Sequence, residues 1–310
     1  MRFLIVGAGA LGGYYGGMLL RGGADVTFLV RPHRAAQLAA RGLIIKLPEG
    51  EFKTPIKTVT AGALGGPYDI VFLTCKAYDL DSAIADFVLA LSPTGAALPV
   101  LNGINHIAVL SDRLGAERVL GGTTQFLVIQ TPEGDIIPTI HGKAQTTFGE
   151  LAGGGSARCD AILAALVAGG VPCSISENIT AEMWMKFCGA AASFTIAAVI
   201  RARASEVVAA PAGARFVAAT FDECARIAAA AGHPPPAWLR EILIQLWSQP
   251  GSSYGPSLLA DIENGRPTEG EHVIGDLARR AGQHGVEAPI VRAALCSVQI
   301  YEARRRRQGR

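Results

Sequence analysis

A glycine-rich segment directly after the first apolar run constrains the fold of this chain more than any other feature. Residues Phe3 to Val6 are apolar without polar alternation, as in a parallel strand that is buried on both faces. The segment Gly7-Ala8-Gly9-Ala10-Leu11-Gly12 follows at once, and residues Tyr14 to Arg21 then have the composition of a helix that ends at Gly22-Gly23. A strand, a glycine turn and a helix in this order predict the start of a βαβ unit.

The three glycines have the spacing G-x-G-x-x-G, and each has a physical reason. Gly7 permits a tight turn, Gly9 lets the backbone approach a pyrophosphate, and Gly12 lets the helix pack closely on the strand. Ala10 and Leu11 lie at the helix N-terminus, where free N–H groups and the helix dipole attract an anion. The alternative is a glycine-rich turn without a ligand, but the position after a strand favours a dinucleotide.

The end of the second predicted strand indicates which dinucleotide is bound. NAD-binding chains usually place an Asp or Glu there for the ribose 2′-OH, whereas this strand ends in Arg31 and Asp25 lies at its other end. Arg31 can hold a 2′-phosphate through two hydrogen bonds, and Arg34 adds positive charge. We therefore expect NADP(H), the alternative being two solvated loop arginines.

Further strands and helices alternate through the first half of the chain and then give way to helices. Apolar runs predict three more strands, and residues Gly121 to Glu150 predict antiparallel strands that finish the same sheet. A helix over Asp160 to Val167 is expected to pack on it, and strand signals fade after about residue 178. The expected fold is α/β: an N-terminal Rossmann-like, doubly wound parallel sheet over residues 1–176 and a C-terminal all-helical domain over residues 177–310. The three strands are Val26 to Val30, Asp69 to Thr74 and Ala96 to Leu101.

Two polar residues follow later strands of the predicted sheet. Lys76 comes after the strand that ends at Thr74, and Asn102 comes after the strand that ends at Leu101. Ligands of open α/β sheets lie beyond the carboxyl ends of the strands, so both residues are candidates for the coenzyme rim. Each of them alone could equally be a helix cap or a solvated loop residue.

Composition excludes several classes of partner. A net charge of +2 and an aromatic content of 6% give no case for nucleic acid, and Arg304 to Arg307 are expected to be a solvated tail. Six cysteines without CxxC spacing or a nearby His predict no metal site and a reduced, cytoplasmic protein. The longest apolar stretch, Gly189 to Ile200, is far shorter than the ~20 residues of a membrane span, so we expect no membrane association.

The sequence resembles the ketopantoate reductase (2-dehydropantoate 2-reductase) family over nearly its whole length. This resemblance implies a Rossmann domain, a helical domain, a site in the cleft between them, and NADPH as the reductant of a 2-oxo acid. It implies that Lys186 is the general acid, that Glu269 orders the site, and that Ser257 contacts the substrate carboxylate. It also implies that Asn102 lies beside the nicotinamide and the substrate, and that Arg31 and Lys76 contact NADP. The motifs that carry the resemblance are GAGALGG at 7–13, Arg31, Cys75-Lys76-Ala77, Asn102-Gly103, Gly122-Thr123-Thr124, Trp184-Met185-Lys186, and Ser257 to Asp261 with Thr268-Glu269.

The chemistry of these residue types agrees with the roles that the resemblance implies. A hydride that reaches a ketone leaves negative charge on oxygen, which an ammonium such as that of Lys186 stabilises and then protonates. The alternative for Lys186 is a surface lysine whose stem packs on apolar neighbours. Ser257 and Asp261 are four residues apart and share one helix face, as an ordinary surface pair would. Glu269 could equally be a first-turn acid of a helix capped by Thr268.

The sequence departs from the family pattern at the substrate. The family's asparagines four, eight and eighteen residues after the lysine are Ala190, Phe194 and Ala204 here, so a substrate hydroxyl loses its amide partners. Ser193 or Thr195 could compensate. Among the histidines, His106 is expected at a helix surface, with a place near the cleft as the alternative, and the others form no constellation.

The expected function is therefore NADPH-dependent reduction of a small 2-oxo acid, with 2-dehydropantoate (ketopantoate) as the first choice. A more apolar 2-oxo acid, or a hydroxy-acid or opine substrate, is the alternative that the lost asparagines favour. A non-catalytic NADP-binding sensor is the alternative outside enzymes. Apolar C-terminal helices would also suit a homodimer.

Overall fold

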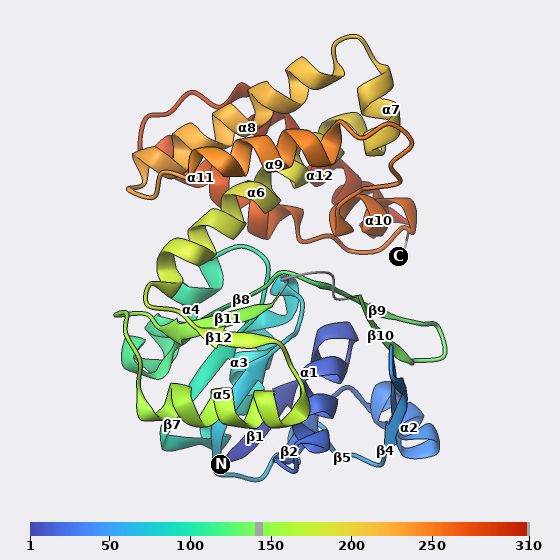
Figure 1. Cartoon of the computed structure of the whole chain (residues 1–310), viewed down its shortest axis with the longest axis vertical. Helices are drawn as coiled ribbons and strands as arrows, with labels where there is room; N and C mark the ends of the chain where they lie inside the picture. The colour runs from blue at the N-terminus through green and yellow to red at the C-terminus, as the bar shows by residue number, and fades with distance from the viewer. Residues whose placement is uncertain (140–144, 309–310) are drawn as a thin grey trace. The chain divides into compact units, whose positions relative to one another are not determined.

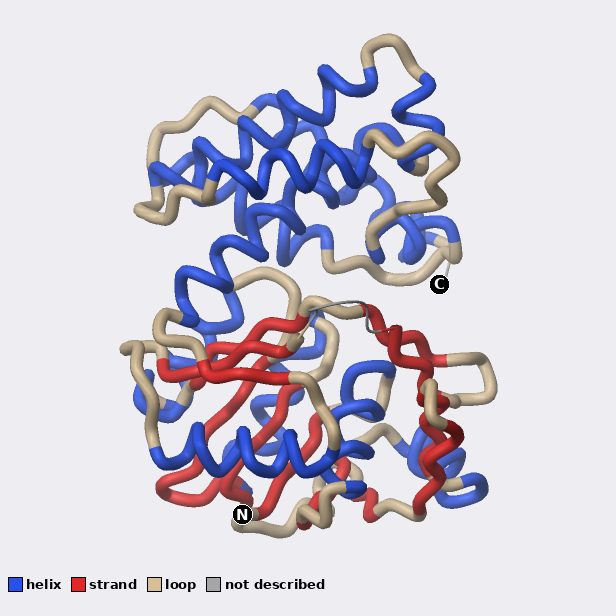
Figure 2. Tube along the Cα trace, viewed as in Figure 1, coloured by secondary structure: helices blue, strands red, loops and turns tan. Residues whose placement is uncertain are grey.

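The computed structural model describes residues 1–139 and 145–308, which form two compact units. The first unit comprises Met1–Leu101 and His106–Thr180, and the second comprises Asn102–Asn105 and Ala181–Arg310. Figure 2 shows strands and helices in the first unit and only helices and loops in the second. The predicted class, a Rossmann-like sheet followed by an all-helical part, is confirmed. The boundary at 176 stays a prediction.

The first unit is built on a five-stranded parallel sheet with the order β5-β2-β1-β6-β7 (Figure 1). β2 and β5 lie on one side of β1. β6 and β7 come later in the chain and lie on its other side, so the strand order reverses between β1 and β6. Such a switch point is where open α/β sheets bind ligands, because the connections on its two sides leave in opposite directions. The strands are β1 (Arg2–Val6), β2 (Asp25–Leu29), β5 (Lys57–Val59), β6 (Tyr68–Leu73) and β7 (Leu91–Pro99).

Both faces of this sheet are buried, which explains the unbroken apolar runs of its strands. Phe3 and Ile5 face the core beneath α1 and α5, whereas Leu4 and Val6 face the core beneath α3 and α4. The predicted packing of the helix near residue 160 on this part of the chain is confirmed, since its apolar side joins the first of these cores. The helices are α1 (Ala10–Arg21), α2 (Pro32–Arg41), α3 (Leu80–Phe87), α4 (Asn105–Leu114) and α5 (Ala157–Gly169), with short 3₁₀ turns η1 (Ala77–Asp79), η2 (Val88–Ala90) and η3 (Ala116–Arg118).

The prediction that residues Gly121 to Glu150 finish the main sheet was wrong. Antiparallel pairs form there as expected, but they belong to two further sheets, β12-β11-β8 and β4-β3-β10-β9, and residues 140–144 lie outside the described residues. Among the described residues, one isolated bridge, Ala97 to Val119, lies between the β7 edge and the start of β8. The strands are β3 (Leu43–Leu47), β4 (Gly50–Thr54), β8 (Leu120–Thr124), β9 (Leu127–Gln130), β10 (Ile136–Thr139), β11 (Thr146–Glu150) and β12 (Cys173–Ile175).

Small residues on α1 explain why a separate sheet forms. A Cβ on Gly13 would lie 2.8 Å from the Ile136 side chain, and one on Gly17 would lie 2.5 Å from that of Ile45. The face of α1 that does not pack on the main sheet is therefore flat enough to receive β3 and β10 directly. His106, expected at a surface, is fully buried in α4, so that prediction was also wrong.

The second unit is helical, as predicted, with breaks at Pro234-Pro235-Pro236 and Pro250-Gly251. Its first helix is the one helix in the described chain long and apolar enough to cross a membrane. Residues 191–198 of that helix are all buried within the structure, as in the core helix of a bundle. The helices are α6 (Ile179–Ile200), α7 (Ala204–Ala209), α8 (Gly213–Ala230), α9 (Ala237–Trp247), α10 (Ser257–Glu263), the π-helical segment η4 (Glu271–Gly275), α11 (Asp276–Gln283) and α12 (Pro289–Arg307).

Candidate functional site

The glycine turn of the first unit is held tightly between β1, β6 and α1. Gly7 has φ +93° and donates its N–H to the carbonyl of Leu29 at 2.9 Å. A Cβ on Gly12 would lie 2.1 Å from the carbonyl oxygen of Gly7 and 2.4 Å from Oγ1 of Thr74. The Thr74 hydroxyl donates to the carbonyl of Val6 at 2.9 Å, which fixes the neighbouring strand end against the turn. Gly7 and Gly12 thus have the structural roles that the motif predicts.

Gly9 differs, because space rather than protein surrounds it. In the described part of the chain, no heavy atom beyond its chain neighbours lies within 4 Å of a Cβ built there. Gly9 is the N-cap of α1, where no side chain caps the helix, and the first turn carries no acidic residue. The N-terminal backbone at Ala10 and Leu11 is therefore left to an outside acceptor, and this open, electropositive helix end fits a pyrophosphate.

The two predicted cationic contacts lie beyond the strands that flank β1. Arg31 is the N-cap of α2 after β2, and Lys76 is the N-cap of η1 after β6. The Arg31 side chain is 77% exposed, and its guanidinium donates to Oδ1 of Asp79 at 2.6 Å. Sequence reasoning did not single out Asp79, because only the fold brings this residue of η1 next to the end of β2.

Arg34, predicted to add positive charge near the coenzyme, makes contacts within the first unit. It is half-buried, and burial lowers the pKa of its guanidinium. Its Nε donates to the carbonyl of Ala8 at 2.9 Å, and its Nη2 donates to the carbonyl of Gly134 at 3.2 Å. These bonds tie the glycine turn to the turn between β9 and β10.

The second unit brings three of the predicted site residues together. The Glu269 carboxylate is 5% exposed and accepts a hydrogen bond from Nδ2 of Asn102 at 3.2 Å. Lys186, on α6, lies within the electrostatic reach of Glu269. Desolvation lowers the pKa of the Lys186 ammonium to about 8, against the opposing effect of the Glu269 charge. An amine with this pKa can give a proton to an oxyanion near neutral pH and then recover it.

The surroundings of Glu269 show that it is not an ordinary surface acid, while its role in the site stays a prediction. A first-turn surface acid would be solvated, whereas Glu269 is buried. Thr268 does accept a bond from the N–H of Gly270, at 3.4 Å, but its own N–H and hydroxyl both donate to Oε1 of Glu302 at 2.8 Å. The Glu302 carboxylate on α12 thus anchors the backbone just before Glu269, and Glu269 is left to face Asn102 and Lys186.

His272 is a member of this cluster that sequence reasoning missed. It lies in η4, its imidazole donates a hydrogen bond to the backbone of Asn102, and burial lowers its pKa. Neither its spacing from Lys186 nor its apolar neighbours distinguishes it in the sequence. Only the three-residue interval from Glu269 gives a signal, since two residues at that spacing can lie on one helix face.

The substrate side of the prediction is only partly assembled. Ser257 is exposed at the first position of α10, while Asp261 is buried and forms an ion pair with Nε of Arg266 at 3.1 Å, so the two are not an equivalent surface pair. Phe194 and Ala204 are buried, and Ala190 is half-buried. The Ser193 hydroxyl oxygen already accepts from Trp247 and Tyr254, each at 3.3 Å. Thr195 is fully buried beside Cys224. Replacement of a lost amide by either hydroxyl stays a prediction.

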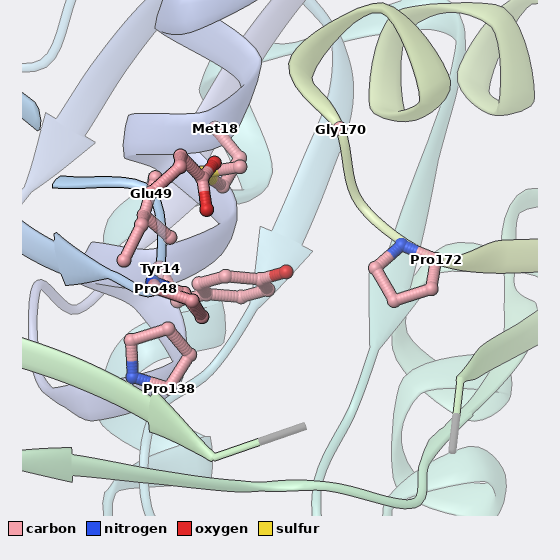
Figure 3. Close-up of a pocket in the computed structure, with 8 residues that line it drawn as sticks. Tyr14, Met18, Pro48, Glu49, Pro138, Gly170 and Pro172 are labelled. Carbon is pink, nitrogen blue, oxygen red and sulfur yellow. The ribbon is translucent and has the colours of Figure 1, made fainter. Parts of the chain in front are cut away.

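A cavity in the first unit lies apart from these residues. It has a volume of about 310 Å³, and Figure 3 shows its walls, which come from α1, the turn after β3, the end of β10 and the chain between α5 and β12. Its one carboxylate, Glu49, pairs with Arg21 at 3.0 Å. None of the predicted coenzyme or catalytic residues lines it, so we assign it no part in the chemistry. The lining residues are Tyr14, Met18, Leu47, Pro48, Glu49, Pro138, Gly170 and Pro172.

Comparison with known families accounts for nearly the whole chain. The family model of ketopantoate reductase PanE/ApbA matches residues 3–153, and the model of the C-terminal part of the same family matches residues 178–302.

Individual proteins resemble the chain along its full length. The uncharacterized oxidoreductase YkpB of Bacillus subtilis is 32% identical over 98% of this chain and 99% of its own length. The 2-dehydropantoate 2-reductase of Halobacterium salinarum is 28% identical over 97% of this chain and 99% of its own length. Among solved structures, a D-mandelate dehydrogenase with NADH and anilino(oxo)acetate superposes with a TM-score of 0.85 at 22% identity, over 99% of this chain and all of that one.

Proposed function

Because the chain belongs to the ketopantoate reductase family, we propose that it reduces a 2-oxo acid with NADPH, 2-dehydropantoate being the first candidate. The chain is an oxidoreductase that acts on a keto or hydroxy group, as this family does. The substrate and the coenzyme preference are our proposal. The six cysteines are free thiols, which supports a reducing compartment such as the cytoplasm.

The observation that carries the proposal is the desolvated amine of Lys186 beside the buried carboxylate of Glu269. Bound NADPH would supply the hydride. As the ketone oxygen gains negative charge, the Lys186 ammonium stabilises that charge and then transfers its proton to the oxygen, which leaves a neutral amine and a hydroxy acid. The amine then takes a proton from water. Glu269 keeps the amine protonated before the reaction. The side-chain amide of Asn102 donates one N–H to Glu269 and keeps its second N–H as a donor.

The coenzyme preference rests on Arg31 and on the open helix end at Gly9. Arg31 is a mostly exposed arginine beyond β2, and its fork of N–H donors matches a 2′-phosphate. No carboxylate stands at the end of β2 itself, but Asp79 engages the same guanidinium. We therefore propose NADPH as the preferred coenzyme and expect NADH to be used less well rather than refused.

The second candidate substrate is a 2-oxo acid with a bulkier, more apolar side chain. It is favoured by Ala190 and Phe194 at the positions where the family has amides, and by the engagement of Ser193 with Trp247 and Tyr254. The D-mandelate dehydrogenase, whose structure contains anilino(oxo)acetate, has the same fold. An apolar wall binds a substrate hydroxyl poorly but excludes an aryl or branched alkyl group much less.

A substrate panel tests the proposal directly. Purified protein is mixed with NADPH or NADH and with 2-dehydropantoate, phenylglyoxylate, 2-oxoisovalerate or pyruvate, and loss of the reduced coenzyme is followed by absorbance. The highest kcat/KM with 2-dehydropantoate supports the first candidate, and the highest with phenylglyoxylate or 2-oxoisovalerate supports the second. Failure of all four acids contradicts the 2-oxo acid proposal.

Replacement of Lys186 tests the mechanism within the same assay. Lys186→Ala is expected to lower kcat by at least about 10²-fold, because the proton donor is lost, while the Kd for NADPH changes little. Lys53→Ala is the matched control, since Lys53 is an exposed lysine on β4 of the first unit. Unchanged turnover in Lys186→Ala would refute the assignment of Lys186.

A further inference from the structure

His272, a half-buried histidine of η4, contacts the segment of the second unit that contains Asn102. His272 lies at the second position of the π-helical segment, three residues after Glu269. A π-helical turn holds one residue more than an α-helical turn, so it alters which side chains face a neighbouring segment, and such turns are frequent at functional sites. Here the segment that His272 reaches is Asn102–Asn105, the one part of the second unit that comes from the first half of the chain.

The contact between His272 and this segment is close on both sides. Gly103 has φ +81°, and a Cβ there would lie 2.8 Å from Cδ2 and 3.1 Å from Nε2 of His272. The imidazole also donates to the backbone of Asn102. The ring thus lies against the backbone of Asn102 and Gly103, where no side chain has room.

Asn102 is consequently held twice from one short stretch of chain. Its side-chain amide donates to Glu269 at 3.2 Å, and its backbone accepts from His272. Without the second bond, Asn102 could rotate about its backbone, and the amide would lose its fixed direction relative to the Glu269 carboxylate. Two bonds to the same residue define both the position and the orientation of its side chain.

The groups around the imidazole are also held in place. Glu269, Asp276 and Arg279 act on it electrostatically, and Asp276 is fully buried between Arg279 at 2.7 Å and Arg280 at 3.0 Å. The Asp276 charge is therefore already balanced by two arginines, which leaves the imidazole as a hydrogen-bond donor rather than as the partner of an ion pair.

We propose that His272 is a positioning residue: it holds the Asn102–Asn105 segment so that the Asn102 amide keeps one orientation toward Glu269 and the substrate. The catalytic part of this inference rests on the proposed function, whereas the structural part does not. The proposal names no proton transfer for His272.

Hydrogen exchange of the full-length protein, without substrate, tests the structural part. His272→Ala is expected to exchange about fivefold faster in a peptide covering residues 102–110, which includes the first helical amides of α4, since one net hydrogen bond is lost. A peptide covering residues 2–12 is the internal control and is expected to be unchanged. Equal exchange of residues 102–110 in both proteins would overturn the proposal.

Steady-state kinetics with the best 2-oxo acid of the panel tests the catalytic part. His272→Ala is expected to lower kcat by about tenfold with a raised KM for the acid, and His272→Gln or His272→Asn, whose amide N–H replaces that of one ring nitrogen, is expected to recover most of the loss. In an Asn102→Ala background, His272→Ala is expected to have no further effect, because the residue acts through that side chain.

The outcomes separate the two proposals. Additive losses in the double variant, or no rescue by either amide together with a lower Tm, would mean that His272 only stabilises the fold, and would overturn the inference. If exchange changes as expected but the wild-type protein reduces no 2-oxo acid, the holding role of His272 stands and the proposed function fails. If the wild-type protein turns over and His272→Ala is unimpaired, the inference fails and the proposed function stands.

Discussion

The glycine turn of the first unit and the amine cluster of the second (Asn102, Lys186, Glu269 and His272) both suit charged ligand groups, but different chemical groups form them. The turn lies within six consecutive residues and works through backbone N–H groups and empty space at Gly9. The cluster takes four side chains from positions 102, 186, 269 and 272 and works through an amine, a carboxylate, an amide and an imidazole. The first site should therefore be intolerant of added volume, whereas the second should be intolerant of changed chemistry.

The largest effect is expected from a single methyl group in the turn. Gly12→Ala would place a carbon 2.1 Å from the carbonyl oxygen of Gly7, a contact that only a backbone shift can relieve. We expect a loss of about 3 kcal/mol or more in the free energy of unfolding, together with loss of coenzyme binding, because the turn itself must move. Thermal unfolding and calorimetry with NADP⁺ measure both effects.

Gly9→Ala is the matched control for volume alone. The same methyl group there meets no protein atom within 4 Å in the described chain, so the Tm should change by no more than a few degrees. Coenzyme affinity should still fall, by about tenfold, since the methyl group enters the space expected for the pyrophosphate. A Gly9→Ala protein that binds NADP⁺ normally would contradict the placement of the coenzyme.

The same contrast explains what could be predicted from the sequence. The turn and its strands follow from local patterns, since the roles of Gly7 and Gly12 depend on neighbours a few residues away or on the next strand. Lys186 and Glu269 needed a family resemblance, because the apolar neighbours of a lysine do not by themselves distinguish a catalytic lysine from a surface one. His272 and Asp79 were missed because their partners, Asn102 and Arg31, lie 170 and 48 residues away in the chain.

The second and third sheets were missed for a related reason. The pairing of β10 with β3 joins Ile136 to Ile45, and no local signal predicts such a distant register. The antiparallel pair β3 and β4 did leave a signal, the turn-forming Pro48-Glu49-Gly50 after an apolar run, which could have been interpreted as a hairpin. Thr and Ile alternation after residue 120 correctly predicted antiparallel strands, but composition alone cannot specify which sheet they join.

A second effect, of about tenfold, should be visible in the pH dependence of turnover. Reduction needs the ammonium form of Lys186, whose pKa is lowered by desolvation to about 8. The kcat for reduction should therefore be constant below that pH and fall about tenfold for each pH unit above it. The kcat for the reverse oxidation, which needs the neutral amine, should rise about tenfold for each pH unit below that pH and be constant above it. Rate profiles in both directions, at saturating substrate, measure this.

Glu269→Gln sharpens this test, because it removes the charge that raises the pKa of Lys186 while it keeps the shape of the side chain. The fall in the reduction rate should then begin at a lower pH than in the wild-type protein. A profile that keeps its midpoint in Glu269→Gln would show that the Glu269 charge does not affect the titration of Lys186. The claim that the second site depends on this charge would then be wrong.

The smallest effect is expected at the one place where the first unit also depends on side-chain chemistry. Asp79 accepts from the exposed guanidinium of Arg31 at 2.6 Å, so a bound 2′-phosphate must share that arginine with a carboxylate. Asp79→Asn removes one negative charge beside the phosphate and should tighten NADP⁺ binding about three- to fivefold, the size of a surface ion pair, with NAD⁺ affinity unchanged. Asp81→Asn is the control, since Asp81 is an exposed carboxylate in the next turn of the same segment. Weaker NADP⁺ binding in Asp79→Asn would mean that the carboxylate orients Arg31 for the phosphate instead of competing with it, and the coenzyme site would then depend on side-chain chemistry as closely as the amine cluster does.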